Sequence, residues 1–250
     1  MRTGALGKLP HRRIVGLPML ATYKRAIALP PPPVAVDWYS KVTSWPLDGN
    51  DSLGDCTCVG VAAAIQQWTT YTGAPKVLTT GQVISFYEKF GYVPGKPDTD
   101  QGAVEADVLS TWRDVGIEGD KLDGFVSLNP INLNDIRDSV NWFGNAYLGI
   151  SLPIAAQNMD MWDVPAGQKL TGDWEPGTWG GHCVVTPGYD AQVFRFNKWG
   201  ELGSMTPAFM SAYLDEAYGL LNHDFITGAG TTPAGLSLAQ LEDDQEALKN

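Results

Sequence analysis

The sequence GNDSLGDCTCVGVAAAIQQW at residues 49–68 joins a polar, turn-rich segment to a long apolar one. From Cys56 to about Tyr71 the residues are apolar on nearly all sides, which is typical of a helix buried in a core. Asp55 stands where a side chain can cap such a helix, and Gly73 stands where a glycine can end it. The thiol of Cys56 therefore lies at the positive end of the predicted helix, where its pKa is lowered and the reactive thiolate is favoured.

The rest of the chain shows helical patterns first and strand patterns later. Helices are expected at about 80–90, 104–115, 133–142 and 206–218, and strands at 146–152, 181–186 and 192–197. Thr206 and Pro207 mark the start of the last helix, and Gly219 marks its end. This order predicts an α+β protein with a helical N-terminal lobe around the buried helix and an antiparallel β C-terminal lobe.

The charge is distributed unevenly along the chain. The net charge is −11, but residues 1–29 hold six basic residues and no acidic one, so subtracting +6 leaves −17 for residues 30–250. Such an acidic body repels phosphate backbones, so nucleic acid is not expected as a partner. The basic segment can lie on the acidic body, reach an assembly partner, or stay solvated.

A run of four prolines, residues 30–33, indicates an extended spacer and a boundary. We therefore expect a basic extended N-terminal arm at 1–33, one domain at 34–227 and an acidic C-terminal tail at 228–250. Within the domain, the helical lobe is expected at about 34–144 and the sheet lobe at about 145–227.

Several classes of protein are disfavoured by composition. The 3 cysteines are too few, and odd in number, for a disulfide framework, which favours a reducing compartment. No apolar run of about 18 residues is present, so no membrane association is expected. The N-terminus lacks the apolar core of a signal peptide, so we expect a cytoplasmic or virion-associated protein that is not classically secreted.

A nucleophilic cysteine at neutral pH needs a histidine nearby, and the chain has 3. His11 lies in the basic arm, where a charged tail is expected, and His223 lies near a helix end, where a surface role is expected. His182 follows two glycines at the start of a predicted strand, so the backbone can approach closely and hold the ring.

Asn197 ends the next predicted strand. If the two strands are adjacent and antiparallel, Asn197 lies beside His182 and its side-chain amide accepts the imidazole N–H. Trp199, two residues later, would shield that hydrogen bond from water.

In order and spacing, these residues resemble the papain-like cysteine peptidases. VDW at 36–38 resembles the start of the mature domain, GDC at 54–56 the nucleophile segment, GGHCVV at 180–185 the histidine strand, and NKWG at 197–200 the family's Asn-Ser-Trp-Gly. The resemblance covers roughly residues 34–205. It implies the papain-like two-lobe fold and hydrolysis of a peptide or amide bond, with a peptide or protein as substrate and no cofactor or metal.

The resemblance also assigns roles to individual residues. It implies a catalytic triad of Cys56, His182 and Asn197, shielded by Trp199. Asn50 takes the place of the family's oxyanion glutamine, beside the backbone N–H of Cys56. Gly102 and Gly181 lie where the family has walls of the substrate cleft.

Some positions depart from the family pattern. Asn50 is shorter than glutamine, Thr57 replaces a tryptophan, and the negative charge of Asp55 beside the thiol raises its pKa. After Asn197 the family continues in strands, whereas this chain is expected to enter a helix. Residues 1–33 are short for an inhibitory prosegment and lack a clear helical pattern, so an arm packed on the body or on a partner is expected instead.

Two other readings remain open from the sequence. One is a catalytically weak or inactive papain-like scaffold that binds or supports other proteins. It could be a phage virion component, because the Asn-Asp-x-x-Gly-Asp-Cys stretch also resembles chains of tailed phages. The other is a zinc site at Cys56, Cys58, His182 and Cys183, although Cys-x-Cys is unusual for structural zinc and Cys58 is expected in the core.

Overall fold

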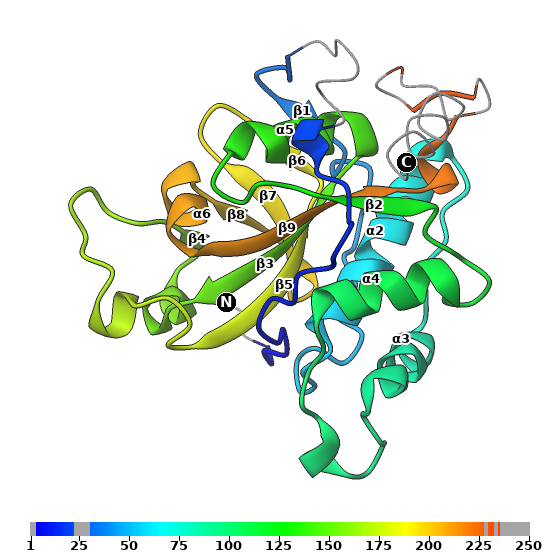
Figure 1. Cartoon of the computed structure of the whole chain (residues 1–250), viewed down its shortest axis with the longest axis horizontal. Coiled ribbons are helices and arrows are strands. Elements are labelled where there is room, and N and C mark those ends of the chain that lie inside the picture. The colour runs from blue at the N-terminus through cyan, green and yellow to red at the C-terminus, as the bar shows by residue number, and fades with distance from the viewer. Residues whose placement is uncertain (1–3, 23–30, 228–229, 233–234, 236–250) are drawn as a thin grey trace.

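The computed structural model describes residues 4–22, 31–227, 230–232 and 235 (Figure 1). The part of the expected arm at 23–30 and most of the expected tail at 228–250 lie outside the described residues. The helices are α2 (Cys56–Thr72), α3 (Thr80–Tyr87), α4 (Glu105–Asp114), α5 (Leu133–Phe143) and α6 (Pro207–Tyr213). Short 3-10 turns are η1 (Glu88–Phe90), η2 (Pro97–Thr99), η3 (Ile154–Asn158), η4 (Gly172–Trp174) and η5 (His223–Phe225).

The strands form two sheets. Strands β2 (Gly124–Ser127), β9 (Leu214–Leu221), β3 (Ala146–Leu152) and β5 (Gly180–Thr186) make one antiparallel sheet in that order. The second sheet contains β1 (Val36–Asp37), β6 (Gly188–Tyr189), β7 (Phe194–Lys198), β8 (Glu201–Met205) and β4 (Met161–Trp162), with only the β4–β8 pair parallel. Helices α2, α3 and α4 lie to one side of the sheets in Figure 1, and the α+β class is confirmed.

The central helix α2 is the buried helix that the sequence predicts. Every residue from Cys56 to Thr69 is buried, and Gly73 ends the helix in the left-handed conformation at φ 90°. Asp55 holds the N-cap position, but its side chain makes no capping hydrogen bond. The predicted cap by Asp55 is therefore wrong, and the carboxyl is instead buried beside the start of the helix.

The predicted helix at 206–218 is too long. Helix α6 ends at Tyr213, and the chain continues as β9, whose two edges pair with β2 and β3. Backbone pairing on both sides, with burial from Glu216 onward, outweighs the helical preference of the local sequence. Gly219 lies inside this strand and does not follow a helix. After Asn197 the chain forms strand β8, then helix α6 and then strand β9, so the expected helix is present but ends earlier than predicted.

His182 and Asn197 do not lie on neighbouring strands of one sheet. Strand β5 pairs with β3, whereas β7 pairs with β6 and β8. Pro187 separates β5 from β6, and a proline has no N–H to continue a ladder. The two side chains therefore come from different sheets.

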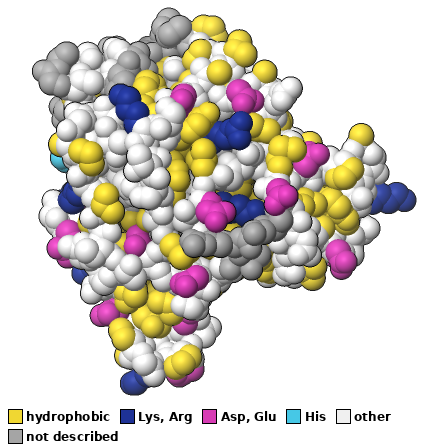
Figure 2. Space-filling model, turned by 180° about the vertical axis from the view of Figure 1, so that it is seen from behind, with side chains coloured by type: hydrophobic (Ala, Val, Ile, Leu, Met, Phe, Trp, Pro, Cys, Tyr) yellow, Lys and Arg dark blue, Asp and Glu magenta, His cyan; other side chains and the backbone are white. Residues whose placement is uncertain are grey.

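Two hydrophobic clusters form the core. One surrounds α2, α3 and α4, and the other lies between the sheets and α5 and α6. On the face opposite to that of Figure 1, acidic and basic side chains are interspersed with hydrophobic ones (Figure 2). Among the described residues, no helix combines the length and the apolar character needed to cross a membrane.

Candidate active site

The start of α2 places Cys56 beneath strand β5. The backbone N–H groups of Cys183, next to His182, and of Gly7 in the arm lie close enough to the Cys56 thiol to lower its pKa. The residue is only 2% exposed. Burial raises the pKa of the thiol to about 12, and the nearby carboxyls of Asp55 and Glu105 add to the rise.

His182 is held by aromatic rings. Its imidazole stacks on the indole of Trp199, with 4.6 Å between ring centroids and 25° between planes. Trp199 has a φ of 43°, in the left-handed region that large side chains rarely adopt, so the surrounding packing fixes its ring over the histidine. Burial, together with the charge of Lys198, lowers the pKa of His182 to about 3. The thiol and the imidazole are therefore both neutral in this structure.

Asn197 is buried, but it does not bind the imidazole. Its Nδ2 donates to the backbone oxygen of Pro46 at 3.5 Å. Among the described residues, neither Asn197 Oδ1 nor His182 Nδ1 has a hydrogen-bond partner. The expected bond between the asparagine amide and the imidazole is not formed in this structure.

The side-chain amide of Asn50 donates to two backbone carbonyl oxygens. Asn50 Nδ2 donates to the oxygen of Ala5 at 3.1 Å and to that of Leu53 at 2.8 Å. The indole N–H of Trp199 also donates to the Ala5 oxygen, at 3.4 Å. One amide N–H and one indole N–H thus donate to the same carbonyl oxygen of the arm.

The arm runs across the site as an extended chain. Lys8 N donates to Gly181 O at 3.1 Å, Ala103 N donates to Gly7 O at 2.8 Å, and Leu9 N donates to Ala103 O at 3.0 Å. In Figure 1 this segment (dark blue) passes beside β5 and α4 and then on toward β2. The expectation that the arm packs on the acidic body is confirmed for residues 4–22.

The two predicted cleft residues face this arm. A Cβ added to Gly102 would collide with the Gly7 carbonyl, and one added to Gly181 would collide with the Lys8 carbonyl. The hydroxyl of Tyr87 accepts the N–H of Gly102 at 2.8 Å and donates to Asp100 at 2.6 Å, which holds the Gly102 wall in place. Only glycine leaves the arm backbone room to pass between these walls.

Some functional contacts of the arm are not apparent from local sequence. Lys8 is buried against Asp215 and Glu216, Arg12 forms an ion pair with Asp107, and His11 Nδ1 lies 2.8 Å from Glu216. The expected charged-tail role of His11 is therefore wrong, because Glu216 lies within reach of its ring. The opposite charges of arm and body were the only sequence signal for these contacts.

The remaining candidate residues have simpler surroundings. All three cysteines are free and buried, and Cys58 is fully buried in the core as expected. His223 is exposed beside Asp123, in agreement with the expected surface role. Within the described ranges, no group of three or more His, Cys, Asp or Glu side chains is arranged to hold a metal ion.

Comparison with known proteins shows which solved structures have a similar fold. No protein-family model matches the chain, and no curated protein sequence is significantly similar to it. Among solved structures, xylellain, a cysteine protease from Xylella fastidiosa, superposes with a TM-score of 0.65 at 15% identity, covering 88% of this chain and 96% of that one. Digestive procathepsin L 3 of Tenebrio molitor gives 0.54 at 16% identity, with 78% and 71% coverage. The bromelain protease of Ananas comosus gives 0.52 at 14%, with 76% and 99% coverage. The fold is papain-like and has two lobes.

Proposed function

We propose that this chain with a papain-like fold is a cysteine hydrolase that cleaves a peptide or amide bond. The observation that supports this most strongly is the extended arm, whose backbone is hydrogen-bonded on both sides at Cys56. Gly181 and Ala103 bind its amides and carbonyls, and Asn50 holds the carbonyl of Ala5. Groups arranged to bind one extended polypeptide beside a thiol can bind another that is a substrate.

In the proposed reaction, Cys56 Sγ attacks the carbonyl carbon of the substrate and transfers its proton to His182. The new oxyanion accepts hydrogen bonds from the backbone N–H of Cys56 and from Asn50 Nδ2. His182 then protonates the leaving nitrogen as the C–N bond breaks. Water, deprotonated by His182, releases the acyl group from the sulfur.

We further propose that the arm holds the enzyme inactive. The arm directs the backbone N–H of Gly7 at the Cys56 thiol and occupies the place of a substrate there. The arm also covers Cys56 and His182 and excludes water from them. Without water, the neutral thiol and the neutral imidazole are favoured. When the arm leaves, water stabilises the thiolate and the imidazolium, so the pKa of Cys56 falls and that of His182 rises.

The substitution Gly7→Val tests this proposal without changing the body. A Cβ on Gly7 would collide with the backbone of Gly54, so the arm cannot remain in place. We expect faster alkylation of Cys56 by iodoacetamide, located by mass spectrometry, and a gain of peptide hydrolysis over the unaltered chain. Val15→Ala is the matched control, because Val15 also lies in the arm but is 93% exposed.

A second candidate function is a binding scaffold with little or no catalysis. It is favoured by the missing hydrogen bond between Asn197 and His182 and by the buried ion pairs that hold the arm. For such a scaffold, Gly7→Val would leave alkylation slow and hydrolysis absent while weakening any assembly that depends on the arm. A place in a phage virion, or in the cytoplasm, remains a prediction for either function.

A further inference from the structure

Two carboxyl groups lie against the Lys8 side chain, which enters the body from the arm, and the charge of a third acts on it. Lys8 Nζ lies 2.9 Å from Asp215 Oδ1 and 2.9 Å from Glu216 Oε1. Glu105, at the start of α4, is fully buried and is the largest of the carboxyl influences on the lysine. We call Glu105, Asp215 and Glu216 the acidic pocket.

The acidic pocket keeps its cation charged. Burial alone lowers the pKa of Lys8, but the charges of Glu105, Glu216 and Asp215 outweigh it and raise the pKa above its ordinary value. With the pocket empty, Glu216 would lose the counter-ion 2.9 Å from Oε1. A buried carboxylate without a partner is costly, so the pocket favours an occupant with a positive charge.

The shape of the pocket fits a long side chain. Gly149 on β3 faces Glu216 on β9 in the sheet register. A Cβ on Gly149 would collide with Lys8 Cε, so the absence of a side chain there opens the space that the lysine stem fills. The pocket is therefore built by β3, β9 and the start of α4, and Lys8 only occupies it.

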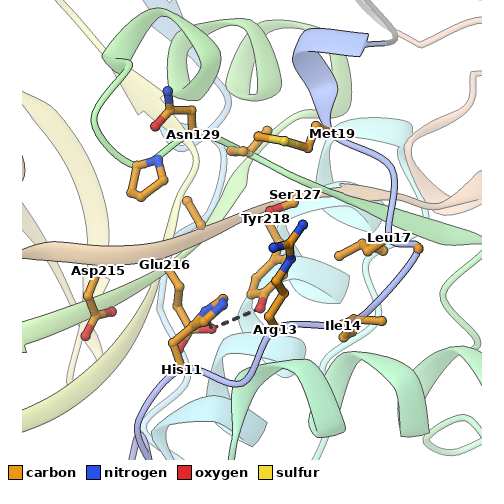
Figure 3. Close-up of a pocket in the computed structure, with 14 residues that line it drawn as sticks. His11, Arg13, Ile14, Leu17, Met19, Ser127, Asn129, Asp215, Glu216 and Tyr218 are labelled. Carbon is orange, nitrogen blue, oxygen red and sulfur yellow. Dashed lines mark hydrogen bonds and ion pairs between the residues drawn. The ribbon is translucent and has the colours of Figure 1, made fainter.

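Glu216 is fixed from its other side as well. Figure 3 shows His11 and Tyr218 directed at this carboxylate. His11 Nδ1 lies 2.8 Å and Tyr218 Oη 3.0 Å from Glu216 Oε2, which leaves Oε1 for Lys8. A cavity of about 460 Å³ on this side, lined by arm residues and by β9, leaves room beyond the carboxylate.

The acidic pocket also lies close to the nucleophile along the bound chain. The residue before Lys8 is Gly7, whose N–H contacts the Cys56 sulfur. We propose that the acidic pocket is the specificity site of the hydrolase, and that it selects polypeptide substrates with a lysine or arginine side chain next to the residue at the thiol. This rests on the proposed function, and the arm occupies the pocket as a substrate would.

A binding experiment tests the pocket independently of catalysis. The full chain carrying Gly7→Val and Cys56→Ala has a displaced arm and cannot cleave. Labelled alanine hexapeptides with one lysine moved through the six positions are titrated by fluorescence anisotropy, with norleucine peptides as neutral controls of equal length. We expect one register in which lysine binds tighter than norleucine by about 30-fold or more, as for a buried charge pair with one partner removed.

Substitution of the pocket completes this experiment. Glu216→Gln should reduce the lysine preference to a few-fold, whereas Glu175→Gln, at an exposed site, should leave it unchanged. If lysine binds no better than norleucine in any register, the pocket proposal is overturned. If lysine is selected but the Gly7→Val chain hydrolyses no peptide, the pocket stands and the hydrolase proposal fails. Hydrolysis without lysine selection rejects the pocket alone.

The arm itself provides a second test, which does not depend on the folding of the Gly7→Val chain. In an otherwise unaltered protein, Lys8→Arg keeps the charge and Lys8→Leu removes it. We expect hydrogen exchange at the amides of Lys8 and Leu9 to stay slow with arginine and to become at least about tenfold faster with leucine, because the arm opens locally more often. Equal protection of the arm in both variants would show that the pocket does not discriminate charge.

Discussion

At the scale of single residues, burial decides the chemistry of Cys56. Its position at the start of α2 predicts a lowered thiol pKa, but the structure raises the pKa to about 12. The helix dipole is worth at most about 2 kcal/mol, and removing water from a thiolate costs more than that. The prediction of a lowered pKa is therefore wrong for the covered site, and it stays a prediction for the open one.

Asn50 is predicted to stabilise the oxyanion. In the Gly7→Val chain, Asn50→Ala removes the side-chain donor, and we expect kcat for a peptide substrate to fall by about 10²–10³ with little change in KM. Asn50→Gln restores an amide donor on a longer side chain and should recover part of the rate. A fall in kcat of less than about threefold for Asn50→Ala would exclude this role.

Asp55 is predicted to make folding depend on pH. Burial raises the pKa of Asp55 to about 8 from an ordinary 3.8, so the folded chain keeps a proton that the unfolded chain loses. This contribution to stability is complete below pH 3.8 and is lost as the pH rises toward 8. In urea unfolding, Asp55→Asn should therefore gain stability relative to the unaltered chain between pH 5 and pH 8. A constant difference between the two proteins over this range would contradict the assignment.

At the scale of elements, the pattern of apolar residues predicts the type and the bounds of a helix or strand when its burial is uniform or strictly alternating. Strand β3 begins and ends where predicted, and α2 differs by one residue at its end. Strand β9 was predicted as helix because Thr206 and Pro207 start one, and the residues after Tyr213 have no breaker. Its conformation is decided by pairing with β2 and β3, which lie far away in the sequence.

A buried hydrogen bond links strand β3 to the start of α2. Tyr147 on β3 donates its hydroxyl to the carbonyl of Thr57 at 2.6 Å, in a fully buried setting. We expect Tyr147→Phe to lower the free energy of unfolding by about 1–2 kcal/mol, because a buried bond is lost. Tyr92→Phe, at a half-buried position, is the control and should change it by less than about 0.5 kcal/mol. Equal effects of the two substitutions would contradict the role given to this bond.

At the scale of the whole molecule, the segregation of charge along the chain brings arm and body together. The sequence shows +6 on residues 1–29 against −17 on the rest, which predicts attraction but not its location. The location depends on Glu105, Asp215 and Glu216, which the fold gathers around Lys8. No local signal marks one lysine of the arm for burial, because its partners lie about a hundred residues or more away.

This attraction is predicted to depend on salt. The Debye length falls from about 10 Å at 0.1 M salt to about 3 Å at 1 M, which weakens exposed pairs such as Arg12 with Asp107 more than the buried Lys8 pairs. Cys56 in the unaltered chain should therefore be alkylated a few-fold faster at 1 M than at 0.1 M sodium chloride. The Gly7→Val chain serves as control, and its rate should not change with salt. Slower alkylation of the unaltered chain at high salt would contradict electrostatic docking of the arm.

The proximity of a reactive thiol and an imidazole is tested most directly by the pH profile of Cys56 alkylation. It is measured in the Gly7→Val chain and in the same chain with His182→Ala, using mass spectrometry to follow Cys56 alone. A thiolate paired with an imidazolium predicts rapid alkylation at pH 6 that disappears with His182→Ala. Two superimposable profiles, each rising only above the ordinary thiol pKa, would contradict a catalytic pair at this site.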